Sequence, residues 1–143
     1  PTLLEAIGER LPEGLDGRSL WPFIERGEDV GHEYIFAELC DFYGPVQAIR
    51  TTQHKLIRNF EPGTGLQIAT DILHTPSGDA MRETLRNWPR PEIELYDLAQ
   101  DPWERNNLAG NPDTDTLKIE SALTRELCNW FSRTSTPILD GSP

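Results

Sequence analysis

Few residues in this chain are of the types that carry out catalysis, and they are widely separated in the sequence. The candidates by type are three histidines and two cysteines, namely His32, His54, His74, Cys40 and Cys128. The histidines lack the H-x-x-x-H and carboxylate spacings that define a zinc site. They fall in a predicted loop, a hairpin tip and a proline-flanked coil, so we expect solvated side chains rather than catalytic ones.

Other catalytic patterns are also missing from the sequence. The cysteines belong to no C-x-x-C pair, so we expect two buried or half-buried thiols, and a disulfide between them stays open. The glycine-containing segment 61–65 is followed by neither the lysine nor the helix of a phosphate-binding loop. There is no G-x-S-x-G nucleophile elbow either. The sequence therefore offers no complete set of nucleophile, base and charge-stabilising group.

Composition limits both the size of the fold and the kind of partner. The 143 residues suffice for one domain with a core, and 13 Lys and Arg against 24 Asp and Glu give a net charge of −11. Nucleic-acid binding is not expected, because tracking phosphates requires a clustered excess of basic residues. The average electrostatic field of this acidic chain also repels anionic substrates, although Arg and Lys side chains close to a site can outweigh that field locally. No apolar run approaches the roughly 20 residues of a membrane helix, so no membrane contact is expected.

The pattern along the chain predicts about four strands and several helices. Segment 34–39 is aromatic and branched and predicts a strand buried on both faces, whereas 46–50 and 55–60 predict a hairpin. A further strand is predicted at 93–98. Short helices are predicted near residues 3–9, with Thr2 as cap and Gly8 able to end the helix, near 19–24, with Ser19 as cap, and over 80–87.

The strongest helix follows Pro112, with Asp113 or Thr114 as its cap. Its apolar stripe consists of Ile119, Leu123, Leu127 and Trp130. This stripe must pack on the sheet. The predicted fold is therefore α+β: a small antiparallel sheet of about four strands, covered by a C-terminal amphipathic helix.

The segment 93–109 (IELYDLAQDPWERNNLA) is the most distinctive part of the chain. It predicts a strand that ends before Pro102, because proline has no N–H for a sheet ladder. Asn106 and Asn107 follow as turn formers whose amides bond to neighbouring backbone. Trp103 and Leu108 are expected to pin the loop to the core, and Trp21, Trp88 and Trp130 are likewise expected to be packing residues.

Four stretches together resemble the C-terminal region of sulfatases of the alkaline phosphatase superfamily. They occur in the family's order, at residues 1–8, 15–20, 48–60 and 93–109, and they cover the chain to about Trp130. The hairpin and the aromatic-rich 34–43 region look most similar to heparan N-sulfatase-like (sulfoglucosamine sulfohydrolase-like) members. The resemblance implies a part of a sulfuric ester or sulfamate hydrolase.

In that family the chemistry belongs to a larger N-terminal domain. The resemblance implies that this partner domain holds a formylglycine, made from a C/S-x-P-x-R motif, and a calcium ion bound by Asp and Asn. Neither Cys40 nor Cys128 is followed by the proline and arginine of that motif. We therefore expect no cofactor, metal or catalytic residue in this chain, and no activity from it alone. A sulfated small molecule or glycan is the substrate implied for the full-length protein.

The resemblance also implies a division of the chain. Residues 1–30 correspond to the end of a catalytic-domain-like segment with a linker, 31–132 to the sulfatase C-terminal subdomain, and 133–143 to a coil tail. Pro1–Gly8 resembles the last helix of the catalytic domain, so its apolar side is expected to be exposed or repacked here. Because the chain lacks an initiator Met and starts within an amphipathic pattern, we expect a processed product or a fragment.

The family segment that tends to face the substrate pocket matches the loop after the first predicted strand, residues 38–43. It contains the carboxylates and aromatics that bind sugar hydroxyls and ring faces, here Glu38, Asp41, Phe42 and Tyr43. For Glu38 the alternative is a hydrogen bond at a domain interface. Arg50 and Lys55 are expected on the solvated face of the hairpin.

Two alternatives to a sulfatase subdomain stay open at this point. The chain could be a non-catalytic protein-binding or glycan-binding α+β module, which a free-standing gene with its own initiator Met would favour. It could also be the tail of a phosphonate monoester or phosphodiester hydrolase, which belongs to the same superfamily and has a similar tail. The choice between sulfate and phosphate rests largely on residues outside this chain.

Overall fold

The computed structural model describes residues 1–15, 17–41, 44–61, 63, 70–86 and 89–134. The chain divides into two compact units, residues 1–33 and 34–143. Within the described ranges no helix is both long and apolar enough to cross a membrane. The second unit contains the sheet and the distinctive 93–109 segment.

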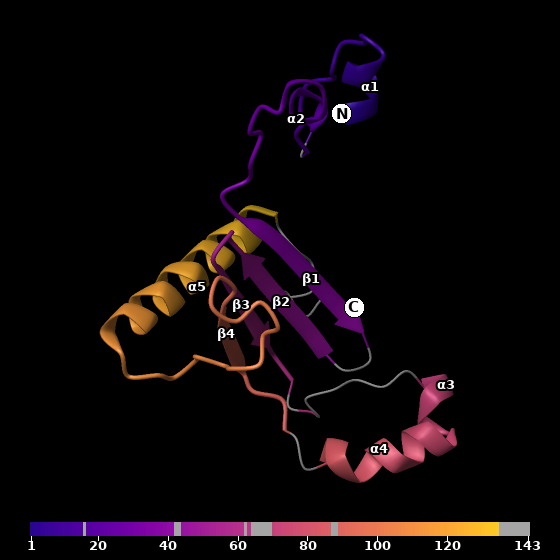
Figure 1. Cartoon of the computed structure of the whole chain (residues 1–143), viewed down its shortest axis with the longest axis vertical. Helices are drawn as coiled ribbons and strands as arrows, with labels where there is room; N and C mark the ends of the chain where they lie inside the picture. The colour runs from indigo at the N-terminus through magenta and orange to yellow at the C-terminus, as the bar shows by residue number, and fades with distance from the viewer. Residues whose placement is uncertain (16, 42–43, 62, 64–69, 87–88, 135–143) are drawn as a thin grey trace. The chain divides into compact units, whose positions relative to one another are not determined.

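The second unit is built on a four-stranded antiparallel sheet, as predicted. Its strands are β1 (Ile35–Asp41), β2 (Gly44–Arg50), β3 (His54–Asn59) and β4 (Ile93–Asp97), in the order β1-β2-β3-β4 (Figure 1). The predicted hairpin is β2 and β3, in which Ile49 pairs with Leu56. Each strand pairs with the next one along the chain, so short connections suffice except between β3 and β4.

One sheet face, here called the helix face, packs against α5 (Thr114–Thr134). The core consists of three sheet residues and three helix residues: Ile49, Leu56, Leu95, Leu123, Leu127 and Phe131. Ile119 and Trp130 pack beside them, so the predicted stripe is confirmed, with Phe131 added. The α+β prediction is therefore confirmed.

The cap of α5 is Asp113 rather than Thr114. A carboxylate oxygen of Asp113 accepts hydrogen bonds from the Thr116 amide at 3.0 Å and from the Asp115 amide at 3.2 Å. These amides belong to the first turn, where no backbone acceptor is available. The hydrogen bond from the Thr116 amide, above all, lowers the pKa of Asp113.

The opposite sheet face, here called the open face, is not covered by α5. Residues 35, 37 and 39 of β1 lie on it, because Ile49 and its partner Phe36 point to the helix face and strand side chains alternate. Ile35 is 59% exposed and Leu39 is 52% exposed. The prediction that this strand is buried on both faces was wrong, because β1 is an edge strand and none of the described residues buries Ile35 or Leu39 on its open face.

Two helices lie between β3 and β4, α3 (Thr70–Leu73) and α4 (Pro76–Arg86). The helix predicted at 80–87 is α4, which begins earlier than expected. The Thr75 hydroxyl accepts a hydrogen bond from the Gly78 amide at 3.2 Å, and Pro76 follows with a backbone angle suited to a first turn. Thr75-Pro76 was therefore a start signal that the sequence interpretation did not use.

The first unit contains α1 (Thr2–Ala6) and α2 (Trp21–Arg26), and neither helix buries a residue. Thr2 is not the cap of α1, because it lies inside the helix and its hydroxyl accepts a hydrogen bond from the Leu20 amide at 3.0 Å. The cap of α2 is Leu20, one position after the predicted Ser19. The unit exposes large apolar side chains, at Leu3, Ile7, Leu15, Leu20, Phe23 and Ile24.

Candidate functional site

The 93–109 segment closes the free edge of β4 by means of one side chain. The Asn107 side-chain oxygen accepts hydrogen bonds from the amides of Leu95 and Ala109, both at 2.9 Å. Its amide nitrogen donates to the Ile93 carbonyl at 3.1 Å, and the Leu108 amide donates to the Leu95 carbonyl at 2.8 Å. The loop thus supplies the hydrogen bonds that a fifth strand would make. Leu108 packs on the core, as predicted.

The tip of this loop is fixed by an aspartate and an ion pair. One Asp101 carboxylate oxygen accepts hydrogen bonds from the amides of Arg105 and Asn106 at 2.7 and 2.8 Å. Glu104 has a φ of 54°, and its carboxylate pairs with the Lys55 ammonium at 2.7 Å. Lys55 is therefore not the solvated charge that its position on the hairpin predicted.

The four tryptophans differ in their surroundings. Trp103 is 77% exposed, so the prediction that it pins the loop was wrong: Asn107 and Glu104 do so instead. Trp130 stacks on Phe36 with ring centres 4.8 Å apart, which confirms its packing role. Trp21 is half-buried, and Trp88 lies outside the described residues.

A polar network lies on the open face at β3 and β4. The Tyr96 hydroxyl donates a hydrogen bond to one oxygen of the Glu94 carboxylate at 2.6 Å. The side-chain amide of Asn59 donates to the other oxygen at 2.8 Å. Asn59 also donates to the Pro91 carbonyl at 2.7 Å. Burial, followed by the hydrogen bond to Glu94, raises the pKa of Tyr96. All these groups are satisfied inside the chain, so the network is structural.

The structure describes only part of the predicted substrate-binding set. Glu38 lies on the helix face of β1, is half-buried, and accepts a hydrogen bond from the Gln47 side chain at 3.3 Å. Asp41 is the last residue of β1 and pairs with Gly44, but its side chain is outside the described part. Phe42 and Tyr43 also lie outside the described residues. The set of four therefore stays a prediction.

A row of polar residues crosses three strands on the helix face. Glu38 pairs in register with Gln47, and Gln47 with Arg58. Gln47 is buried, whereas the Arg58 guanidinium lies 4.8 Å from the ring centre of Phe60 and donates to the Cys128 sulfur at 3.9 Å. The sequence interpretation did not single out Gln47 or Arg58, because an alternating strand does not say which polar positions face a helix.

A pocket lies beyond the end of β3 and the start of β4, and is here called the end pocket. Its volume is about 250 Å³, and it is lined by Arg58, Asn59, Phe60, Glu61, Arg90 and Glu92. Backbone hydrogen bonds hold the end of β3 beside the start of β4. The backbone amide of Asn59 donates to the Glu92 carbonyl, and the backbone amide of Arg90 donates to the Gly63 carbonyl. The end pocket thus combines basic, acidic, amide and aromatic groups.

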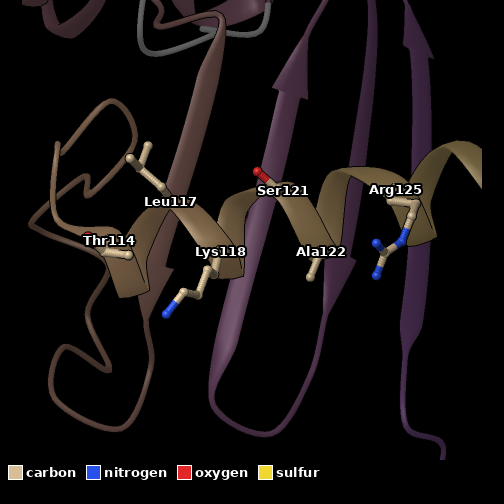
Figure 2. A pocket seen from close by; sticks show the side chains of 6 residues that line it. All are labelled: Thr114, Leu117, Lys118, Ser121, Ala122 and Arg125. Carbon is tan, nitrogen blue, oxygen red and sulfur yellow. The ribbon is translucent and has the colours of Figure 1, made fainter.

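A second pocket, of about 430 Å³, lies on the outer side of α5. Figure 2 shows that its six lining residues all belong to this helix, with the strands behind it. Its two cations already have partners, since Lys118 pairs with Asp115 at 2.9 Å and Arg125 with Glu126 at 3.7 Å. This surface is a groove along a single helix rather than a site built from several elements.

Metal ligands do not gather in the described part of the chain. Among those residues no group of three or more His, Cys, Asp or Glu side chains could hold a metal ion. His54 begins β3 and is half-buried, while His32 and His74 are exposed. Cys128 is a free, exposed thiol, so the expectation of a buried thiol was wrong at this position: it lies at the flank of the packed face of α5.

Comparison with known proteins identifies relatives of the whole chain. No family model matches it. It is 30% identical over 148 residues to an ulvan-active sulfatase of Formosa agariphila, and 31% identical over 141 residues to a second one, covering 92% of this chain in both cases. A solved 2-O GAG sulfatase is 25% identical and covers 99% of this chain with a TM-score of 0.68.

The matches are to part of each relative only. The chain spans about a quarter of the length of the curated relatives, 24% and 27%, and 25% of the solved sulfatase. Its sheet and C-terminal helix are the fold found in the sulfatase structure. The relatives of this chain are therefore sulfatases, and the chain corresponds to a small part of such a larger protein, consistent with a C-terminal sulfatase region.

Proposed function

We propose that this chain is the C-terminal subdomain of a sulfuric ester or sulfamate hydrolase. In this role it stabilises the catalytic domain and lends loops to the substrate pocket, and it contributes no catalytic residue. The observation that carries the proposal is the match of 92% of the chain to about a quarter of an ulvan-active sulfatase. The name of this relative supports a sulfated glycan as the substrate of the full-length protein. Membership of the heparan N-sulfatase-like group stays a prediction.

Exposed apolar side chains support the proposal that a further domain packs against this chain. In the first unit α1 and α2 bury no residue and leave Leu3, Ile7 and Phe23 exposed. In the second unit Ile35 and Leu39 stand exposed on the open face. Several large apolar side chains exposed in this way are typical of an interaction surface in a soluble protein. We infer that the N-terminal catalytic domain covers both surfaces.

Calcium and formylglycine belong to that catalytic domain in this proposal. Among the described residues of this chain, no group of three or more His, Cys, Asp or Glu side chains could hold a calcium ion. The role proposed for the end of β1 and the residues that follow it is contact with substrate. Glu38, Asp41, Phe42 and Tyr43 are the proposed contacts, offering hydroxyl acceptors and aromatic faces to a sugar.

The experiment that tests this function is to read the coding sequence upstream of Pro1 and to assay both proteins. We expect a C/S-x-P-x-R motif upstream, hydrolysis of an aryl sulfate by the full-length protein with calcium, and no hydrolysis by the 143-residue chain. Turnover by the chain alone would overturn the proposal. An initiator Met near Pro1 with no catalytic domain upstream would favour the binding-module alternative, and preference for a phosphonate monoester would favour the phosphohydrolase alternative.

A further inference from the structure

We propose that the end pocket binds one anionic sugar unit and that Arg58 pairs with the carboxylate or sulfate group of that unit. The proposal rests on the function proposed above, which makes a sulfated glycan the substrate class. It adds a binding subsite on β3 that is separate from the predicted loop after β1.

Arg58 is a half-buried cation whose charge is not neutralised within the described part of the chain. Its contacts there are the Phe60 ring, 4.8 Å from the guanidinium carbon, and the Cys128 sulfur at 3.9 Å. Lys55, which is also half-buried on β3, pairs with Glu104 at 2.7 Å. A partly desolvated guanidinium without a carboxylate is a favourable position for an anionic ligand.

The residues around Arg58 are held in place before any ligand binds. The cation–π contact with Phe60 restrains the position of the guanidinium. Gln47, its neighbour in register, is fixed by Glu38, and Asn59 is fixed by hydrogen bonds to the Pro91 carbonyl and to Glu94. A preorganised wall loses little entropy when a ligand binds.

Size and lining define the class of ligand. At about 250 Å³ the end pocket is smaller than the ~300–1,000 Å³ of drug-sized sites, which suits a single ring. Glu61 and Glu92 offer carboxylate acceptors for hydroxyl groups and disfavour a compact polyanion. One charge together with several hydroxyls is the pattern of a uronic acid or a sulfated hexose.

The net charge of −11 opposes any anion at long range. Screening limits this effect to about 8 Å at physiological ionic strength, so the charges that line the end pocket matter more than the net charge, and Arg58 must act there against Glu61 and Glu92. The expected affinity is weak, with a Kd on the order of millimolar, because one charge-assisted contact and a few hydroxyl contacts contribute.

The test is a titration of the 143-residue, ¹⁵N-labelled chain followed by NMR, with sodium glucuronate, glucose 6-sulfate and neutral glucose as separate ligands. We expect saturable shifts of the Arg58, Asn59 and Phe60 amides with at least one anionic sugar and none with glucose. The two anionic arms distinguish a carboxylate from a sulfate. Arg58→Gln should weaken binding at least tenfold, whereas Arg125→Gln, on the outer side of α5, should not.

Arg58→Met serves as a second variant, since it removes the charge but keeps an unbranched chain over Phe60, and its spectrum reports whether the fold is retained. Shifts that do not saturate, or unchanged affinity in both Arg58 variants, would overturn the inference. Failure of binding together with an upstream C/S-x-P-x-R motif leaves the sulfatase function standing. Binding in the absence of that motif would support the subsite and would contradict the proposed sulfatase function.

Discussion

The side-chain oxygen of Asn107 accepts a hydrogen bond from the backbone amide of Leu95 at 2.9 Å. Leu95 is a core residue on β4, the last strand of the sheet, and its carbonyl receives the Leu108 amide. A side chain 12 positions along the sequence thus completes the hydrogen bonding of an otherwise free strand edge. The structural role of the 93–109 segment is therefore to cover the free edge of β4.

We expect Asn107→Ala to lower the free energy of unfolding by about 1–3 kcal/mol, because it leaves the half-buried Leu95 amide without its acceptor. Urea denaturation followed by circular dichroism measures this. Asn106→Ala is the matched control, since in the described structure only the backbone amide of Asn106 is engaged. Equal losses in the two variants would contradict the assigned role.

The backbone angle of Glu104 makes a second prediction. Its φ of 54° lies in the left-handed region, which costs an L-residue roughly 1 kcal/mol and costs glycine little. Glu104→Gly and Glu104→Ala both remove the ion pair with Lys55. We therefore expect the glycine variant to unfold at a higher temperature than the alanine variant. The reverse order would show that the loop relaxes at this position.

Tyr96 predicts a dependence of stability on alkaline pH. Its pKa is raised above the ordinary value of 10.0 by burial and by the hydrogen bond to Glu94. Because the folded-state pKa exceeds the unfolded-state pKa, this stability is fully present below pH 10 and is lost as pH rises through the folded-state pKa.

We expect Tyr96→Phe to be less stable than the wild type at pH 7, by about 1–2 kcal/mol, because Glu94 loses a donor. The difference should shrink progressively above pH 10, where the wild type alone loses stability from this group. Unfolding free energies measured across this range test it. A constant difference would argue against ionisation of Tyr96.

The open face predicts different behaviour in the isolated chain and in the full-length protein. Leu39→Asp should change the stability of the 143-residue chain by no more than about 0.5 kcal/mol, because the side chain is 52% exposed. In the full-length sulfatase it should sharply reduce the yield of soluble enzyme, because the carboxylate would be buried against the catalytic domain.

Leu117→Asp is the matched control for this experiment, because Leu117 is also exposed but lies on the outer side of α5. We expect the full-length Leu117 variant to stay soluble and active. Equal yields for both variants would show that the open face is not the interface with the catalytic domain.

The sequence alone predicted the parts of this protein that depend on local pattern. Alternation in 46–60 predicted the β2–β3 hairpin, and the spacing of Leu123 and Leu127 predicted the buried side of α5. The motifs in 1–8, 15–20, 48–60 and 93–109 predicted a sulfatase C-terminal region, which the relatives confirm. Such features can be predicted because they depend on the spacing of residues that lie close together in the sequence.

Only the tertiary structure decided which polar groups meet. It made β1 an exposed edge strand, left Trp103 in solvent, and brought Lys55 to Glu104, 49 positions apart. It also placed Arg58 beside Phe60 at the end pocket, where no described carboxylate forms an ion pair with it. Alternation gives two faces to every strand but does not say which face a helix, a loop or another domain covers. That choice depends on long-range packing, which carries no local signature in the sequence.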